Sequence, residues 1–304
     1  MLVDPEHLPD PRQLAERPDD TGVLMANPEH FDVTYVINPH MEGNVGNVDR
    51  ALAQRQWKAL YDTYEQLGYE VHAIPGQPDL PDLVFTANQS FPVQRPDGSW
   101  VVVMSRMRSA HRRPEVPFIQ AFYDERGAEV VHLPEDAGFF EACGDCRWHP
   151  RRRLVYGGYG FRTKRTALQY LADRIDVPVV PLRLVDPRFY HLDTCLSPLT
   201  EDAALVVEEA FTPDGLAFLR RCFPELIPVP LDEAAHGFAA NGNCPDGQHF
   251  VVHHGNEQTR RNVEALGIDV IELDTSEFIK SGGSVFCMTM MFRSATNDEV
   301  SADL

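Results

Sequence analysis

The sequence predicts a single α/β domain built from five similar units that close on themselves. Five segments with helical periodicity recur, and the last four of them start about 45–50 residues apart. Short runs rich in valine, isoleucine, phenylalanine and tyrosine lie between these segments. No linker or low-complexity stretch divides the 304 residues, and a fixed spacing with weak self-similarity is typical of a repeat architecture.

The clearest helix is predicted over residues 47–69. Leu52, Trp57, Leu60 and Tyr64 recur there near the period of 3.6 residues and would form one apolar face. Four weaker periodic segments follow, and each predicts one further helix: residues 116–126, 166–176, 213–223 and 257–267. Each of the five units would therefore contain one helix.

Seven short runs predict strands, because most are enriched in β-branched and aromatic residues and each is bounded by Gly, Pro, Asp or Asn. They are residues 33–38, 82–88, 100–105, 153–159, 203–209, 249–254 and 284–292. These runs alternate with the predicted helices, so the units should combine strands with one helix each.

The balance of charged residues limits the classes of partner. The chain has 27 Lys and Arg against 46 Asp and Glu, a formal net charge of −19. We expect no nucleic-acid partner and no association with anionic membranes, because both require a positive surface. No apolar stretch reaches the roughly 18 residues that a membrane span needs.

The two ends of the chain suggest its domain organisation. Residues 1–20 are acidic and proline-rich, so we expect a disordered extension and no signal peptide. Residues 294–304 are expected to form a tail, which leaves residues 21–293 as one domain. The chain is predicted to be cytoplasmic.

Six cysteines occur, and cytoplasmic thiols are normally reduced, so a disulfide framework is not expected. Cys143 and Cys146, in "CGDC", have the spacing of a redox or zinc motif. A structural zinc site needs about four ligands, usually from a second such pair, and the chain has none. The segment also does not resemble a strand followed by a helix, which a thioredoxin-type site requires. We therefore predict no metal.

Polar residues at the ends of predicted strands indicate candidate functional groups, because unpaired polar groups are costly there. Asn88 ends one run, and Glu141 follows two phenylalanines. His191 and Asp193 are two residues apart, which would place them on one face of a strand. Cys287 follows a glycine pair that would allow a ligand or a loop to approach closely.

Each of these residues also has a purely structural interpretation. Cys287 could be a small core residue, Asn88 a turn cap, Glu141 a solvated carboxylate, and His191 and Asp193 a hydrogen-bonded pair. Together a thiol, an imidazole and carboxylates suit nucleophilic catalysis on a cationic substrate. The residue types alone leave both interpretations open.

The motifs in this order resemble the guanidino-group-modifying superfamily, which includes arginine deiminases, dimethylarginine dimethylaminohydrolases, amidinotransferases and arginine dihydrolases. The phrases "YVINPHMEGN", "FTAN", "GYGFR" and "RFYHLDTC" are most similar to the arginine dihydrolase module, and the resemblance covers about residues 22–292. It implies the pentein fold, a five-bladed α/β propeller with pseudo-fivefold symmetry, and hence a single catalytic domain.

The resemblance also implies roles for particular residues. Cys287 would be the nucleophile, His191 the general acid and base, and Glu141 the carboxylate that orients His191. Residues that would bind the substrate are Asp193 and Asn88 at the guanidinium, Arg162 and Arg106 at the α-carboxylate, and Asn38. It implies no cofactor and no metal.

The activity implied is hydrolysis of free arginine, through a covalent thiouronium on the cysteine, to ornithine, ammonia and carbon dioxide. Dihydrolases have Asn at the position of Asn88, where deiminases and dimethylargininases usually have Asp. In "EACGD" Cys143 replaces a small residue near the site, which could change the pocket's size. Dimethylarginine dimethylaminohydrolase, arginine deiminase and amidinotransferase remain alternatives, the substrate being arginine or methylated arginine, and an oligomer is possible.

Two other classes of protein agree less well with these residues. A non-catalytic binding protein would have no need to retain the thiol, the imidazole and both acids. In a papain-like protease the cysteine lies near the start of the mature chain and opens a helix, whereas Cys287 lies near the end of this one.

Overall fold

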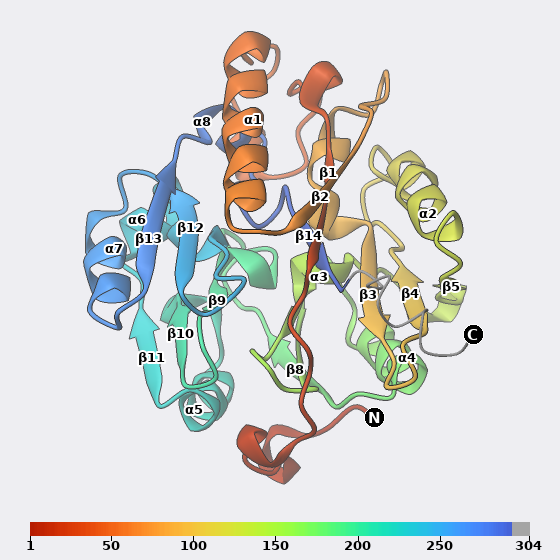
Figure 1. The fold of residues 1–304 in the computed structure, drawn as a ribbon, viewed down its shortest axis with the longest axis vertical. Coiled ribbons are helices and arrows are strands. Elements are labelled where there is room, and N and C mark those ends of the chain that lie inside the picture. Colours follow the sequence, from red (N-terminus) through yellow and green to blue (C-terminus); the bar gives the residue numbers. More distant parts are fainter. Residues whose placement is uncertain (294–304) are drawn as a thin grey trace.

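Five βαβ units follow one another along residues 1–293, the part of the chain that the computed structural model describes (Figure 1). In each unit one helix joins two parallel strands. In chain order the units are β1 (Gly22–Ala26), α1 (Arg50–Gln66) and β2 (Glu70–Ile74); β4 (Trp100–Met104), α2 (Val116–Asp124) and β5 (Glu129–His132); β7 (Val155–Tyr159), α4 (Arg165–Ile175) and β8 (Val179–Arg183); β10 (Ala203–Val206), α5 (Pro213–Cys222) and β11 (Glu225–Pro228); and β12 (His249–His253), α7 (Glu257–Glu264) and β13 (Asp269–Leu273). Parallel strands need a long crossover, which explains why one helix recurs in every unit.

Four of these parallel pairs are extended by an antiparallel strand. The added strands are β14 (Met290–Phe292) on β1, β3 (Ser90–Gln94) on β4, β6 (Cys146–Trp148) on β7, and β9 (Leu196–Pro198) on β10. Within residues 1–293 the strands form five separate small sheets. The predicted mixed α/β class and the five predicted helices are confirmed, with helix ends that differ by a few residues.

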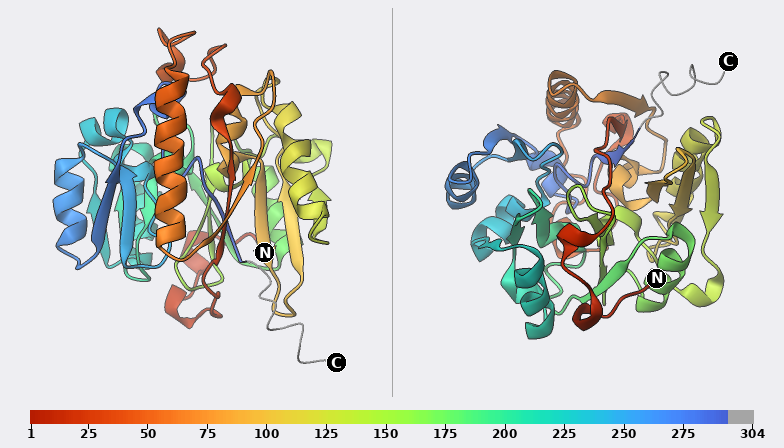
Figure 2. Two further views of the ribbon diagram at one scale, coloured as in Figure 1. Left: turned by 45° about the horizontal axis from the view of Figure 1, so that its top comes forward. Right: turned by 60° about the horizontal axis from the view of Figure 1, so that its bottom comes forward.

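Short helical turns gather near the middle of the molecule, where Figure 1 labels α3 (Ala142–Asp145). α3 contacts η6 (Thr86–Asn88) and η9 (Leu192–Thr194), and η9 contacts η11 (Ala239–Asn241). Figure 2 shows the same arrangement from two further directions, with the helices of the units on the outside. Side chains on these central turns come from different units, so the turns can assemble a site from distant parts of the sequence.

The remaining short elements lie before the first unit, within the units, between them and after the last one. The α-helices are α6 (Leu231–Gly237) and α8 (Ser276–Ile279). The 3₁₀ helices are η1 (Pro5–His7), η2 (Pro11–Gln13), η3 (Pro28–His30), η4 (Pro39–Met41), η5 (Pro81–Val84), η7 (Arg113–Glu115), η8 (Glu135–Ala137) and η10 (Glu208–Ala210). Proline occupies one of the first two positions in most of them, where its missing N–H costs nothing.

Three of the seven predicted strands are wrong in whole or in part. Residues 33–38 form a loop, residues 82–88 form η5 and η6, and only the end of 284–292 is a strand, β14. These segments are apolar because they are buried near the centre: Val33, Val285 and Met288 have no exposed surface. Short apolar runs do not distinguish a buried strand from another buried segment.

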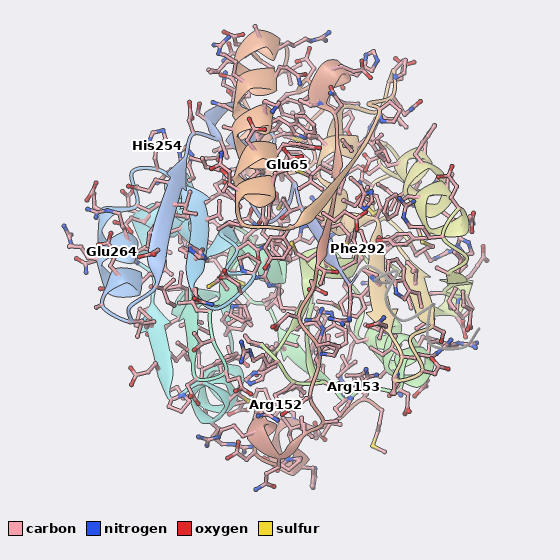
Figure 3. The ribbon with its side chains drawn as sticks, viewed as in Figure 1. Glu65, Arg152, Arg153, His254, Glu264 and Phe292 are labelled. Atoms are coloured by element: carbon pink, nitrogen blue, oxygen red, sulfur yellow. The ribbon has the colours of Figure 1, made fainter. Side chains whose placement is uncertain are left out.

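The N-terminal segment packs onto the third unit, which corrects the prediction of a disordered extension at residues 1–20. The backbone N–H of Val3 donates to Val179, and Leu8 is buried in the core cluster around β8 and β10. Arg153 donates through its backbone N–H to Ala15, and Figure 3 shows Arg153 beside this segment. The prediction was wrong because it rested on the acidic, proline-rich composition of the whole segment and not on the few apolar residues that make these contacts.

The predicted tail, residues 294–304, lies outside the described residues. Within the described part of the chain, no helix is both long and apolar enough to cross a membrane.

Candidate active site

A small cavity near the centre brings together five of the residues singled out in the sequence. It has a volume of about 20 Å³, enough for one water molecule. Twelve residues line it: Ile37, Asn38, Asp82, Phe85, Asn88, Arg112, Arg162, Tyr190, His191, Ser281, Gly282 and Cys287. Glu141 and Asp193 lie behind the lining and contact His191 and Cys287.

Glu141 and His191 form a tight pair on one side of the cavity. Nε2 of His191 lies 2.6 Å from Oε2 of Glu141, which also accepts from Nη1 of Arg162 at 3.1 Å. Burial alone would raise the pKa of Glu141, but the hydrogen bond with His191 and the charge of Arg162 lower it below its ordinary value. The carboxylate therefore stays ionised, and it fixes the orientation of the imidazole.

Cys287 contacts a carboxylate and an amide. Its Sγ donates to Oδ2 of Asp193 at 3.2 Å and accepts from Nδ2 of Asn241 at 3.2 Å. Oδ1 of Asn241 accepts from the backbone N–H of Ser284 at 3.0 Å and of Cys287 at 3.4 Å. One buried asparagine thus holds both the side chain and the backbone of the cysteine.

The protonation of Cys287 and Asp193 is coupled. Burial and the neighbouring charge of Asp193 raise the pKa of the Cys287 thiol well above its ordinary value. Burial also raises the pKa of Asp193 to about 7, although its hydrogen bond with Cys287 and the charge of Arg147 oppose this. In the empty site the thiol therefore keeps its proton, and a cation beside the pair would favour its loss.

The glycine pair before Cys287 is required by close packing. Gly282 has a φ of +86°, and a Cβ atom there would lie 2.6 Å from Oη of Tyr190 and 2.8 Å from Nδ2 of Asn38. A Cβ atom on Gly283 would lie 2.4 Å from Cε1 of Phe85. Both positions therefore need glycine, and neighbouring segments of the chain make the close approach.

Asn88 lines the cavity and has a buried hydrogen-bond donor without a partner among the described residues. Its Oδ1 accepts from Nη1 of Arg112 at 2.9 Å, and because arginine can only donate, the other amide atom must be Nδ2. Among the described residues Nδ2 of Asn88 has no hydrogen-bond partner. Gly144 leaves room for it, since a Cβ atom there would lie 2.4 Å from this nitrogen.

Arg112 and its partners hold Asn88 in place. The guanidinium of Arg112 donates to Glu115 through Nε at 3.1 Å and through Nη2 at 2.9 Å, and it donates to the backbone oxygen of Asp82 at 3.1 Å. Burial alone would lower the pKa of Arg112, but the charges of Glu115 and Asp82 raise it above its ordinary value. Arg112 therefore stays charged while it orients the amide of Asn88.

Arg162 and Asn38 close the cavity on the side of the loop at residues 33–38. Nη2 of Arg162 donates to the backbone oxygen of Ile37 at 3.0 Å, and its guanidinium lies 4.7 Å from the centre of the Tyr190 ring. Nδ2 of Asn38 donates to the backbone oxygen of Ser281 at 2.9 Å. A substrate much larger than water would have to displace some of these contacts.

Arg106 is the one predicted site residue that neither lines the cavity nor forms a hydrogen bond or ion pair with Cys287, His191, Glu141 or Asp193. Its backbone pairs with Phe140, and its Nε is buried with no partner among the described residues. His191 and Asp193 also do not lie on a strand: they flank and occupy η9, and their side chains reach different partners. A turn can separate two side chains that a strand would have placed on one face.

Sequence reasoning missed Asn241 and Arg112. An internal similarity could have found the first, since "FAAN" at residues 238–241 repeats "FTAN" at residues 85–88. Each phrase ends in a 3₁₀ helix whose asparagine reaches the centre, η6 for Asn88 and η11 for Asn241. Arg112 lies in "HRRP" with no comparable signal.

Within the described residues, one group of possible metal ligands is close enough together to hold an ion: His253, His254 and Asp274. Nδ1 of His253 accepts from the backbone N–H of Thr275 at 3.1 Å. Burial lowers the pKa of His253 to about 4, so the neutral ring carries its proton on Nε2. That ring therefore has no free lone pair to offer a metal, and none of the three residues lines the cavity.

The arrangement suits attack by a thiol on a small cationic group. It combines a thiol, an imidazole held by an ionised carboxylate, and a second carboxylate, Asp193, whose Oδ1 has no partner among the described residues. A planar cation could donate to that oxygen and approach Cys287 at the same time.

Comparisons with known proteins support this interpretation. The family of eukaryotic N,N-dimethylarginine dimethylhydrolases matches residues 34–294. The N(G),N(G)-dimethylarginine dimethylaminohydrolase of Mycobacterium tuberculosis is 34% identical over 269 residues, which cover 88% of this chain and 84% of that protein. The bifunctional arginine dihydrolase/ornithine cyclodeaminase ArgZ of Synechocystis is 35% identical over 274 residues. This match covers 90% of the chain but only 38% of ArgZ.

A solved structure shows the same relationship. The N-terminal domain of ArgZ, described as an arginine dihydrolase of cyanobacteria and bound to substrate, superposes with a TM-score of 0.85 and 33% identity. The superposition covers 90% of this chain and 99% of that domain.

Proposed function

The chain belongs to the N,N-dimethylarginine dimethylhydrolase family, and we propose that it hydrolyses the guanidino group of free arginine to ornithine. One arginine and two waters would give ornithine, two ammonia and one carbon dioxide. The observation that carries this choice is the unpartnered Nδ2 of Asn88, beside a cavity that also holds Cys287 and His191. Such a donor suits the oxygen of a urea, which is the group left after arginine loses its first ammonia.

The proposal includes the finer architecture that the sequence predicts. The five βαβ units would be five blades of a propeller with pseudo-fivefold symmetry, with α3, η6, η9 and η11 at its centre. The repeated phrase "FTAN"/"FAAN" at equivalent turns supports this arrangement. Because the nucleophile is a free thiol, the proposal also includes a reducing compartment, the cytoplasm.

The substrate would bind with its guanidinium beside Asp193 and its α-carboxylate near Arg162. Oδ1 of Asp193 would accept from guanidinium nitrogens, since it lacks another partner among the described residues. Arg162 would exchange its bond to the Ile37 backbone for the substrate carboxylate and keep Nη1 on Glu141. The carboxylate would thus replace a contact that closes the empty cavity.

The first half of the reaction would begin with transfer of the thiol proton to His191. A guanidinium beside Asp193 would favour the thiolate, which attacks the guanidinium carbon and forms a C–S bond. His191, held by Glu141, would then protonate one nitrogen, and the C–N bond would break to release ammonia. A thiouronium would remain on Cys287.

The second half would release the enzyme. Neutral His191 would take a proton from water, whose oxygen attacks the thiouronium carbon, and the C–S bond would break to return the thiolate and citrulline. The amide of Asn88 would hold the ureido oxygen by donating from Nδ2. A second cycle on this retained urea would give ornithine, ammonia and carbon dioxide.

Dimethylarginine is the second candidate substrate. It is favoured by the match to the dimethylarginine dimethylaminohydrolase of Mycobacterium tuberculosis, which extends over 84% of that protein, whereas the chain spans 38% of ArgZ. That reaction would release dimethylamine and stop at citrulline. It needs apolar space for two methyl groups, which Phe85 and Ile37 could line.

Product analysis tests the proposal. Purified protein would be incubated separately with arginine, citrulline and dimethylarginine, and the products followed by mass spectrometry. We expect ornithine from arginine, no turnover by Cys287→Ser, and full activity in Cys222→Ser, which removes another buried thiol in α5. Turnover by Cys287→Ser, or action on dimethylarginine alone, would contradict the proposal.

A further inference from the structure

A second, larger cavity lies behind the candidate active site and contains an unpaired cation. Its volume is about 360 Å³, within the range of small-molecule sites. It shares no lining residue with the first cavity. Phe286 lines the larger cavity and its neighbour Cys287 lines the smaller one, so the segment around these two residues separates them.

Arg147 lines this rear cavity from the middle of β6. Its exposed fraction is 5%, and its guanidinium lies 3.4 Å from the centre of the Phe286 ring. Nη1 is buried without a hydrogen-bond partner, and no ion pair of Arg147 occurs among the described residues. A cation stacked on an aromatic ring keeps its N–H donors in the guanidinium plane, where a carboxylate can accept two of them.

The lack of a partner for Arg147 is costly. Burial lowers the pKa of Arg147 to about 10, although the charge of Asp193 opposes this. The residue therefore remains charged at neutral pH, and a buried charge without an adjacent counter-ion destabilises a fold. An anion that enters the cavity would offset part of this cost.

The acidic residues around the cavity do not supply that anion, because they are already paired. Asp20 lies 2.5 Å from Arg17, and Glu201 lies 2.5 Å from Arg152. Asp246 lies 2.6 Å from His249. These carboxylates are directed to other partners, and together they make the rim negative, which disfavours a dianion such as phosphate.

We propose that the rear cavity is a binding site for a small monocarboxylate with an apolar body, anchored by Arg147. The carboxylate would pair with N–H donors of the guanidinium, none of which donates to an acceptor among the described residues. Apolar groups that line the same space would cover the rest of the ligand: Trp148, Phe286, Leu199 and Met291. This cavity shares no lining residue with the smaller one, and the proposal does not depend on the proposed function, although the charge of Arg147 lowers the pKa of Asp193.

Calorimetric titration with 4-iodobenzoate tests this site. We expect one molecule to bind per chain, with at least roughly tenfold weaker binding to Arg147→Met, because a charge-assisted hydrogen bond is lost. Arg151→Met is the matched control, since Arg151 lines the same cavity but is 62% exposed, and its affinity should not change. The neutral isostere 4-iodobenzamide should not bind, and neither should inorganic phosphate.

The iodine atom provides a second measurement that needs no variant. In crystals of the unmodified protein soaked with 4-iodobenzoate, the anomalous signal should lie in the rear cavity, with the carboxylate at Arg147. This result decides the matter if Arg147→Met does not fold. Absence of binding, equal binding of the benzamide, or an iodine found only elsewhere would overturn the proposal.

Discussion

The thiol of Cys287 donates a hydrogen bond to the carboxylate of Asp193 across 3.2 Å. Both groups are buried. Burial and the charge of Asp193 hold the pKa of the thiol well above its ordinary value, and burial raises the pKa of Asp193 to about 7 although the hydrogen bond from the thiol opposes this. In the empty site the pair therefore carries at most one negative charge at neutral pH. Only a cation beside it would allow both to ionise.

This relationship predicts how Cys287 reacts with alkylating reagents. At pH 7 neutral iodoacetamide should modify it at least roughly tenfold more slowly than a free cysteine, because one pKa unit changes the thiolate fraction tenfold. A cationic amidine reagent, such as 2-chloroacetamidine, should react faster at the same pH. Mass spectrometry of the modified peptide over time gives both rates.

Asp193→Asn is the control for the electrostatic cause. Removing the carboxylate should lower the pKa of the thiol, so iodoacetamide should react faster with this variant than with the unmodified protein. The preference for the cationic reagent should shrink at the same time. If the neutral reagent reacts equally with both proteins, access and not charge limits the reaction.

Asp193 should also reduce the stability of the fold at neutral pH. Its pKa is about 7 in the folded protein and about 3.9 in an unfolded chain, so the folded state binds more protons between these values. The free energy of unfolding should therefore fall as the pH rises from about 4 to 7. Asp193→Asn should abolish this decrease in the free energy of unfolding. The variant should therefore be more stable than the unmodified protein at pH 8 by more than about 1 kcal/mol, or roughly 2–4 °C in Tm.

Thermal unfolding at pH 5 and pH 8 checks this. Asp232→Asn is a suitable control, because the side chain of Asp232 in α6 is 92% exposed. This substitution should leave the difference between the Tm at pH 5 and the Tm at pH 8 unaltered. A Tm of Asp193→Asn that is no higher than that of the unmodified protein at pH 8 would show that the buried carboxylate carries no net cost.

Asn241 should act by positioning Cys287. Asn241→Asp keeps the acceptor for the backbone N–H groups of Ser284 and Cys287 but removes the Nδ2 donor to Sγ and adds a negative charge. We expect kcat for arginine to fall at least roughly tenfold and its pH profile to move to higher pH, with little change in KM. Steady-state kinetics over a range of pH measures both effects.

Asn243→Asp separates this role from a general effect of a buried charge. Asn243 is also buried, but its Nδ2 donates to Oη of Tyr64 at 2.8 Å and does not contact Cys287. This variant should leave the pH profile unchanged even if it lowers stability. A similar alkaline shift in both variants would mean that Asn241 has only a structural role.

The sequence located much of this site but not its geometry. The motifs identified Cys287, His191, Glu141 and Asp193, yet Glu141 and His191 are 50 residues apart, and only the fold shows that they touch. Asn241 was missed because its contacts with the thiol and the backbone N–H of Cys287 cannot be inferred from its residue type.

The elements of the fold were predictable to different degrees. The helix α1 has a long apolar face, and Trp57, Leu60 and Tyr64 are buried there as their spacing predicts. The strands β2 and β11 were missed because they are short and half-exposed, so they contain no apolar run. The run at residues 284–292 was misassigned for the opposite reason, because it is apolar and forms a buried turn before β14.

Arg162 should serve two functions that one substitution can separate. Arg162→Ala should weaken arginine binding by roughly ten- to a hundredfold through loss of a charge-assisted pair with the α-carboxylate. Guanidines without a carboxylate should lose much less affinity, although their turnover should fall because Glu141 loses its bond at 3.1 Å. Two measurements distinguish these functions. Ligand binding is compared in Cys287→Ser protein with and without Arg162→Ala, and turnover is measured with arginine and with a guanidine that lacks a carboxylate. Equal loss of affinity for both ligands would leave Arg162 a structural role only.

The amide of Asn88 should decide whether the reaction continues past citrulline. Nδ2 of Asn88 can donate to a ureido oxygen, whereas the carboxylate of Asn88→Asp would repel that oxygen and instead favour the guanidinium cation. Arg112 would still pair with the new carboxylate, so the side chain should keep its orientation. We expect arginine to give mainly ornithine with the unmodified protein and mainly citrulline with Asn88→Asp.

Time-resolved product analysis of both proteins measures this partition. Added citrulline should be hydrolysed by the unmodified protein and spared by Asn88→Asp, which links the product change to recognition of the urea. Asn47→Asp adds the same charge in an exposed loop and should leave the product ratio unchanged. Stoichiometric accumulation of citrulline by the unmodified protein would exclude a dihydrolase, and the unpartnered donor of Asn88 would then serve a reaction that stops after the first ammonia.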